Sequence, residues 1–482
     1  MSATRSGSWP AFQRGCRLRR LAGAALAALL GLWATATPAQ TSPGRPSYES
    51  FRFNEDWSPL RDPALRTDPF DPLKWIPLNG TGSAYLTLGG ELRARYEAAR
   101  DPVFGLAAPR RNDYTLLRSF LFADLHLGPH ARAFLELGSG FAPGWAGTPP
   151  PTQKDELDIL QAFGELTLPM ADGKVMLRGG RQEISLGSSR LVSVRESPNI
   201  RRAFDGLRAA WIGSGDTRID AFLLRPVAPR SGVFNDGRDQ AQLFWGAYAT
   251  AAIPAVPGLK ADLYYLGLER DEAHFAQGVG NERRHTLGAR LFGKRGGFDW
   301  NVEAAYQFGS FGTAAIHAWT VSANLGYSFA DLPFSPRLGL NADAISGDGN
   351  PRDNRLGTFN PLFPKLPYFS EANLAAPANL LDLQPNLTLS LTPRLNVTLG
   401  WNPLWKQTEA DAFYAPPLSP VRGSAGGTGR FIGQQTSLAL TWSATEHLTI
   451  GGTYVHYTPG ERLKQAGAGS GAFLAGWAQF IF

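Results

Sequence analysis

The feature that most limits how this chain can fold is a long series of segments in which apolar and polar residues alternate. In residues 86–97, Leu88 and Leu92 occupy one face while Arg93 and Arg95 occupy the other. Alternation with a period of two is typical of a β-strand whose two faces meet different surroundings. After residue 40 the sequence contains no run of 18 apolar residues, so it predicts no membrane-spanning helix.

Eighteen such segments are candidate strands, and the connections between them mostly alternate in length. The segments lie near residues 84–98, 113–128, 130–139, 156–168, 174–186, 205–213, 217–225, 239–252, 260–269, 283–293, 298–309, 314–328, 336–346, 380–391, 394–406, 431–443, 446–458 and 471–482. Short turns at one rim and long loops at the other are expected of a transmembrane barrel. The sequence therefore predicts an all-β fold, a transmembrane antiparallel β-barrel of about 18 strands over residues 81–482. One short connection, 310–313, breaks the alternation.

The amino-terminal residues predict a signal peptide over residues 1–39. Five arginines precede an apolar run at 21–32, and small residues then lead to Gln40, which is the three-part pattern of a cleaved secretory signal. Residues 40–80, rich in Pro, Asp and Arg, are predicted to form a periplasmic N-terminal lead-in. A secreted chain that spans a membrane by strands is expected in the outer membrane of a Gram-negative bacterium.

Charge and residue types exclude several function classes. Residues 1–39 hold five of the 47 basic residues and none of the 41 acidic ones, so the remaining chain has 42 basic residues against 41 acidic ones. That balance does not suggest a basic surface for nucleic acid, and no nucleic-acid partner is expected. The single cysteine, Cys16, lies within the predicted signal peptide, and the seven histidines are scattered. No disulfide, metal site or cofactor is therefore expected.

The lumen of the predicted barrel is expected to carry charge. A charged side chain facing lipid would cost roughly 2–4 kcal/mol at the midplane, so the polar face of each strand is predicted to face the lumen. On this reasoning Arg181 and Glu183 point inward, with Ile184 and Leu186 toward lipid. Residues 178–202 hold six arginines but only two glutamates. Arginine rings select anions, although arginine and glutamate can also form ion pairs that only stiffen the wall.

The candidate residues for binding and selecting an anionic substrate share this lumenal placement or lie in the arginine-dense stretch. They are Arg93, Arg95, Arg118, Arg181, Arg190, Arg195, Arg201, Arg202 and Lys406.

Several segments together resemble the bacterial alginate-export outer-membrane porin family. They are 53–58 (FNEDWS), 88–97 (LGGELRARYE), 180–183 (GRQE), 190–192 (RLV), 195–196 (RE), 198–202 (PNIRR), 204–206 (FDG), 357–364 (GTFNPLFP) and 368–369 (YF). The resemblance covers nearly all of the chain after the predicted signal peptide. It implies an 18-stranded barrel with an electropositive constriction, through which a polyuronate is secreted while arginines attract its carboxylates. It also implies outer-membrane lipid and a periplasmic export scaffold as partners of a monomeric barrel.

Three functions remain open at this point. The leading hypothesis is export of an anionic exopolysaccharide, an alginate-like polyuronate, through an electropositive lumen. The alternative is a general or small-anion uptake porin, with the long loop 347–379 acting as a constriction or lid. No G-x-S-x-G, H-E-x-x-H or P-loop motif occurs, so an enzyme is not predicted. A hydrolase with a Ser–His pair on the barrel wall needs no local motif and stays a third alternative.

Overall fold

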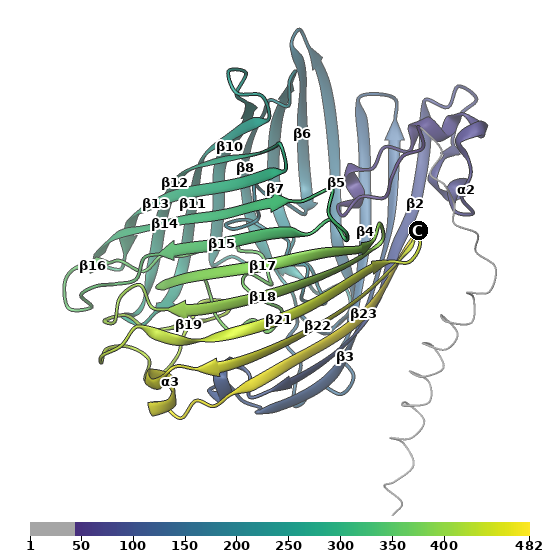
Figure 1. The fold of residues 1–482 in the computed structure, drawn as a ribbon. Helices are drawn as coiled ribbons and strands as arrows, with labels where there is room; N and C mark the ends of the chain where they lie inside the picture. The colour runs from purple at the N-terminus through teal and green to yellow at the C-terminus, as the bar shows by residue number, and fades with distance from the viewer. Residues whose placement is uncertain (1–43) are drawn as a thin grey trace, which may run out of the picture.

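A computed structural model describes residues 44–482, and its main feature is a closed antiparallel barrel (Figure 1). Eighteen long strands and the two-residue strands β1, β9 and β16 make up one sheet of 21 strands. β2 pairs with β23 at the other end of the chain, which closes the barrel. The predicted signal peptide, residues 1–39, lies outside the described residues.

All eighteen predicted strands are confirmed. The long strands are β2 (Ala84–Arg100), β3 (Arg111–Leu127), β4 (Ala131–Phe141), β5 (Asp155–Met170), β6 (Gly173–Gln182), β7 (Phe204–Gly213), β8 (Arg218–Ala228), β10 (Gln242–Ala252), β11 (Leu259–Phe275), β12 (Gly278–Arg295), β13 (Phe298–Phe311), β14 (Ala314–Ser328), β15 (Arg337–Ile345), β17 (Leu380–Thr392), β18 (Leu395–Trp405), β21 (Phe431–Ser443), β22 (Leu448–Pro459) and β23 (Gly471–Ile481). Among residues 44–482, no helix combines the length and the apolar character needed to cross a membrane.

The connections divide the barrel into two rims. The C-terminus and residues 44–83 lie at one rim, here called the terminal rim, and the long loops lie at the other, the loop rim (Figure 1). The irregular connection predicted near 310–313 is a two-residue turn between β13 and β14. A second short connection, 276–277, was not predicted. It arises because β11 and β12 continue to pair beyond a bulge between Arg270 and Ala273.

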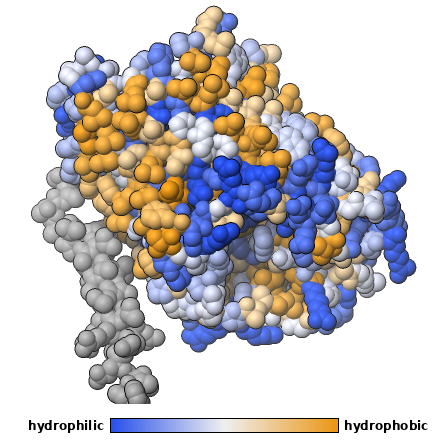
Figure 2. All heavy atoms as spheres, turned by 180° about the vertical axis from the view of Figure 1, so that it is seen from behind, coloured by the Kyte–Doolittle hydropathy of each residue, from blue (hydrophilic) through white to orange (hydrophobic). Residues whose placement is uncertain are grey.

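The outer surface of the wall is apolar where apolar and polar residues alternate along a strand as predicted. Leu92 is 44 % exposed on the outside, whereas its neighbours Arg93 and Arg95 are buried inside the barrel. Figure 2 shows apolar side chains gathered over one part of the wall and hydrophilic ones over another. The exposed leucines of this wall suit contact with lipid, because apolar surface is favoured in a hydrocarbon medium.

Residues 44–83, which include most of the predicted lead-in 40–80, fold against the terminal mouth of the barrel. They contain η1 (Arg52–Asn54), η2 (Ser58–Arg61), η3 (Pro63–Leu65), α2 (Asp71–Lys74) and β1 (Ile76–Pro77). The Phe53 ring meets the rings of Phe134 and Phe163 edge to face, with centroid distances of 6.2 and 6.0 Å. Lys74 Nζ donates a hydrogen bond to the Leu88 carbonyl oxygen at 3.0 Å. The segment is thus fixed to the wall rather than hanging below it.

Two long loops fold into the barrel and meet there. The first inner loop, residues 183–203, connects β6 to β7, and the second inner loop, residues 346–379, connects β15 to β17 and includes β16 (Arg355–Leu356). A parallel bridge joins Val192 to Phe363. The Lys365 amide also donates to the Ser189 carbonyl oxygen at 2.9 Å. Together the two loops form a partition across the lumen.

The first inner loop corrects one prediction about β6. The predicted strand 174–186 ends at Gln182, and Ile184 and Leu186 do not face lipid. They are 1 % and 7 % exposed, in an internal apolar cluster that includes Phe204 and Phe359. Because the chain turns inward after Gln182, these side chains pack between the two inner loops and the wall.

The remaining short elements lie in the loops at the loop rim. They are η4 (Val103–Gly105), β9 (Gly237–Arg238), β19 (Tyr414–Ala415), β20 (Ser419–Pro420) and α3 (Glu461–Gln465).

Candidate functional site

The partition separates two cavities in the lumen. A cavity of about 620 Å³ on the loop-rim side is lined by Arg195 and Arg202, among others. A cavity of about 550 Å³ on the terminal-rim side is lined by Glu196 and Lys365, among others. We call them the loop-side and terminal-side cavities. Arg201 lines both, so the residues around it lie where a substrate would pass from one cavity to the other.

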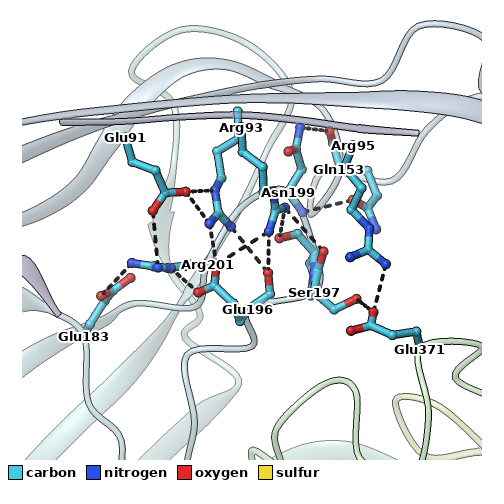
Figure 3. Close-up of polar contacts among 12 residues, drawn as sticks. Glu91, Arg93, Arg95, Gln153, Glu183, Glu196, Ser197, Asn199, Arg201 and Glu371 are labelled. Carbon is cyan, nitrogen blue, oxygen red and sulfur yellow. Dashed lines mark hydrogen bonds and ion pairs between the residues drawn. The ribbon is translucent and has the colours of Figure 1, made fainter. Parts of the chain in front are cut away.

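A network of charges around Glu196 fixes the first inner loop to the wall (Figure 3). Arg201 Nε donates to Glu196 Oε2 at 2.7 Å, and Arg118 of β3 pairs with both Glu196 and Glu91. Arg93 Nη1 donates to the Glu196 carbonyl oxygen at 2.9 Å. Three of the predicted substrate-binding arginines are therefore already occupied by carboxylates and carbonyls of the protein itself.

The environment of Glu196 favours its ionised form. Burial within the barrel opposes ionisation, but the positive charges of Arg118, Arg201 and Arg93 outweigh it and hold the pKa of this carboxyl well below its usual range. The Glu196 side chain is nevertheless 49 % exposed to the lumen. A charged carboxylate that lies at the surface of the lumen occupies the position that a carboxylate of a substrate could take.

Glu183 is a second acid of the network, and its surroundings oppose its ionisation. Its carboxyl is almost completely buried. Burial raises the pKa of this carboxyl, the nearby charge of Arg201 lowers it by less, and the resulting pKa is about 8. Arg201 Nη1 is 3.8 Å from Glu183 Oε2. The raised pKa favours the neutral form of Glu183, so this carboxyl only partly compensates the charge of Arg201.

Arg95 and Arg190 also lie inside the barrel and also have acidic partners. Arg95 Nη2 donates to Glu371 Oε2 of the second inner loop at 2.8 Å. Arg190 Nη1 is 3.2 Å from Glu303 Oε2 on β13. These pairs connect the inner loops to the wall, which is the structural role that the sequence left open for lumenal arginines.

Arg181 does not face the lumen, contrary to the prediction. It lies on the same face of β6 as Leu177, which is exposed on the outside of the wall. Its Nε donates to Asp205 Oδ1 of β7 at 2.9 Å. The prediction failed because it assigned the lipid-facing side of the strand from Ile184 and Leu186. These two residues lie beyond the end of the strand.

Lys406 does not line either cavity. Its side chain is completely buried, and Nζ donates to the carbonyl oxygens of Glu409, Asp411 and Ser424 at 2.7, 3.3 and 2.9 Å. Lys406 therefore organises the loop 406–430 and is not available to a substrate.

Replacing Lys406 tests this structural role. Lys406→Met is expected to lower the free energy of unfolding by about 2 kcal/mol, because it leaves buried carbonyls without a donor. It should also make loop 406–430 more sensitive to protease, while ion selectivity stays unchanged. Lys464→Met, at an exposed lysine of α3, is the control. Thermal unfolding, limited proteolysis and bilayer recording check these outcomes. A change of selectivity in Lys406→Met alone would contradict the assignment.

Arg195 and Arg202 are the two predicted arginines that remain without an acidic partner among residues 44–482. No hydrogen bond or ion pair of either guanidinium is found within that range. Arg202 lies over the Phe363 ring, with its Cζ 4.9 Å from the centroid. Burial, and then the neighbouring charge of Arg195, lower the pKa of Arg202, and burial lowers the pKa of Arg195 to about 10. Two adjacent positive charges without a direct ion-pair partner among the described residues thus line the loop-side cavity.

Lys365 adds a third cation, which sequence reasoning missed. It belongs to the second inner loop and lines the terminal-side cavity. Within the described part of the chain its Nζ has no acidic partner, and lies 5.6 Å from the centroid of the Tyr368 ring. No sequence pattern around a single lysine in a long loop marks it as a binding residue. Only the contact between the two inner loops places it at the terminal-side cavity.

This arrangement is suited to binding anions rather than to catalysis. The planar guanidinium group presents paired N–H donors that match a carboxylate. Arg195 and Arg202 offer such donors on one side of the partition, and Lys365 offers an ammonium on the other. A chain of carboxylates could contact both sides in turn.

Comparison with known proteins gives one family and many similar barrels. A family model described as Alginate export matches residues 84–475. No curated protein matches the chain.

The similar solved structures are outer-membrane barrels. The Pseudomonas aeruginosa OpdO structure is 12 % identical, with a TM-score of 0.56, and covers 82 % of this chain and 97 % of its own. The P. aeruginosa outer-membrane protein OpdK is 9 % identical, with a TM-score of 0.55 over 82 % and 98 %. P. aeruginosa OccK2 (OpdF), solved in complex with glucuronate, is 12 % identical, with a TM-score of 0.54 over 82 % and 98 %. At these identities the likeness concerns the fold alone.

Proposed function

Because the chain belongs to the alginate export family, we propose that it exports an anionic exopolysaccharide, an alginate-like polyuronate, through its lumen. Family and fold identify an outer-membrane channel and not an enzyme. The observation that carries the choice of an anionic substrate is the pair Arg195 and Arg202. The two guanidinium groups are unpaired among residues 44–482 and line the loop-side cavity.

A polyuronate would meet cations on both sides of the partition. It would first contact Lys365 in the terminal-side cavity and then Arg195 and Arg202 in the loop-side cavity. Conduction requires binding that is strong enough for entry and weak enough for release, which several successive sites provide. A periplasmic scaffold that delivers the polymer to the terminal rim is part of this proposal.

Passage between the cavities would require Glu196 to give up its arginines. Its carboxylate contacts Arg118 and Arg201 much as a uronate carboxylate would. An arriving carboxylate could therefore exchange with Glu196, and the first inner loop would move as the exchange occurs. In this proposal the occupied arginines serve as the gate, and the unpaired ones serve as the binding site.

Neutralising the unpaired arginines tests the choice of substrate. The double variant Arg195→Gln/Arg202→Gln is expected to lose most of the channel's preference for anions in planar bilayers. Block of the current by uronate oligomers should weaken about tenfold for each arginine, which corresponds to about 1.4 kcal/mol each.

The matched control is Arg283→Gln, at an outward arginine that is mostly exposed and pairs with Glu269. It removes the same charge away from the lumen and should leave both readouts unchanged. A wild-type pore that prefers cations, or a double variant that matches wild type, would refute the proposal.

Uptake of small anions is the second candidate function. It is favoured by the similar barrels solved with a bound carboxylate, OccK2 with glucuronate and OpdK with vanillate. Deletion of the gene distinguishes the two: loss of polymer secretion with unchanged uptake of small carboxylates supports export. The reverse result supports uptake.

A further inference from the structure

Three aspartates meet at the loop rim, and the proposed function gives none of them a role. Asp155 and Asp158 lie at the start of β5, and Asp236 lies in the loop 229–241 between β8 and β10. One carboxylate oxygen of each lies within 4.8 Å of the others. The sequence search for metal ligands relied on histidine and cysteine, and it missed this cluster of aspartates. The three aspartates also come from two segments far apart in the sequence.

The backbone holds the two segments in a defined relation. Leu157 forms a parallel bridge with Val233, and the Phe234 amide donates to the Leu157 carbonyl oxygen at 2.9 Å. Asp158 Oδ2 accepts hydrogen bonds from the amides of Asn235 at 2.6 Å and Asp236 at 2.9 Å. The three carboxylates are therefore positioned by strand and loop contacts.

One carboxylate oxygen in the cluster lacks a partner. Asp155 is 1 % exposed, and its Oδ1 accepts no hydrogen bond from any residue of the described range. A buried carboxylate oxygen without a donor is costly unless a cation or another ligand satisfies it. Asp155 is also a member of the group of three whose carboxylates converge within 4.8 Å, and an unsatisfied oxygen in such a group points to a missing ligand.

The protein's own cations balance these three acids only in part, since no ion pair of Asp155 or Asp236 occurs among residues 44–482. Arg181 Nη1 is 3.7 Å from Asp158 Oδ1, beyond hydrogen-bond distance. The same guanidinium is already bound to Asp205 through Nε at 2.9 Å. The local excess of negative charge is thus left for a ligand from solution.

We propose that Asp155, Asp158 and Asp236 bind one calcium ion, which fastens loop 229–241 to the end of β5. Calcium takes six to eight oxygen ligands in flexible geometry, and carboxylates of surface loops commonly supply them. All three aspartates also line the loop-side cavity, so water can complete the coordination. The cation also offsets negative charge in the cavity that contains Arg195 and Arg202. The metal site does not depend on which polymer or solute the channel carries.

Calcium binding can be measured on the purified barrel in detergent. After the protein is stripped with a chelator and the chelator removed, titration with CaCl₂ is expected to give one saturable site with a Kd on the order of 10⁻⁴–10⁻³ M. MgCl₂ should bind more weakly, because magnesium demands a stricter octahedral geometry. In Asp155→Asn and Asp236→Asn, affinity for calcium should fall at least about tenfold, because loss of even an outer-shell partner of a bound metal typically weakens binding by about 10–100-fold.

The matched control is Asp239→Asn. Asp239 lines the same cavity but lies outside the cluster, and its carboxylate accepts from the Ala241 amide and from Gln242. It should bind calcium like wild type. Calcium should also slow proteolysis within loop 229–241 in wild type and Asp239→Asn but not in Asp236→Asn.

Two results would overturn the proposal. One is the absence of saturable binding to wild type up to about 10 mM calcium, well above the weakest affinity expected for such sites. The other is equal affinity in Asp236→Asn and Asp239→Asn. Asp236 lies in a loop rather than in the wall, so Asp236→Asn gives an answer even if Asp155→Asn does not fold.

Discussion

The double variant Arg195→Glu/Arg202→Glu is expected to change the channel from anion-preferring to cation-preferring. Each substitution replaces an unpaired positive charge of the loop-side cavity by a negative one. A unit charge about 8 Å from a permeating ion contributes about 2 kcal/mol at an effective dielectric constant of about 20. In planar bilayers with a KCl gradient, the reversal potential should therefore change sign.

Two controls test the effect of the reversed charges: a high salt concentration, and a charge reversal on the outside of the barrel. At about 1 M salt the screening length falls to about 3 Å, so the difference between variant and wild type should shrink. Arg283→Glu, on the outside of the wall, should not affect the reversal potential at any salt concentration. An unchanged sign in the double variant at low salt would show that Arg195 and Arg202 do not set selectivity.

Glu196→Ala is expected to loosen the partition and to open the channel. The substitution removes the carboxylate that Arg118 and Arg201 share and leaves their charges partly uncompensated. Breaking a buried pair in this way costs about 3–5 kcal/mol. Since Glu196 is half exposed to the lumen, a smaller loss of about 2 kcal/mol is expected after solvent screening. Single-channel conductance should rise, and thermal unfolding should shift to lower temperature.

The pH dependence of the wild-type channel follows from the same carboxyl. Because the pKa of Glu196 is depressed in the folded protein, its contribution to stability is present above the ordinary glutamate value of about 4.3. The contribution is lost only as pH falls through the depressed pKa. Wild type should therefore keep its low conductance down to about pH 4, while Glu196→Ala should be open throughout.

Glu156→Gln serves as the control for Glu196. Glu156 pairs with Lys154 near the loop rim, and both side chains are partly exposed. This variant should match wild type in conductance and in stability. If Glu196→Ala has wild-type conductance and stability, then Glu196 does not hold the partition in place.

The sequence predicts the structure best where the placement of a side chain depends only on its neighbours in the same strand. Leu92 and Arg93 alternate because one face of a strand meets lipid and the other meets the lumen. Neighbouring residues alone therefore predict their placement, and the structure confirms it. The same reasoning failed at Ile184 and Leu186, since the chain leaves the wall after Gln182 and packs against the second inner loop.

The sequence by itself determined the barrel, its eighteen strands and the inward direction of Arg93, Arg95 and Arg118, because a period of two is a property of each strand alone. Only the tertiary structure decided which charges remain unpaired. Arg190 is matched by Glu303 from a distant strand, while Arg195 and Arg202 find no acidic partner in residues 44–482. Coulomb interactions depend on distance in space and not along the chain. The charge of the lumen is therefore set by the contacts of the two inner loops, which no local pattern encodes.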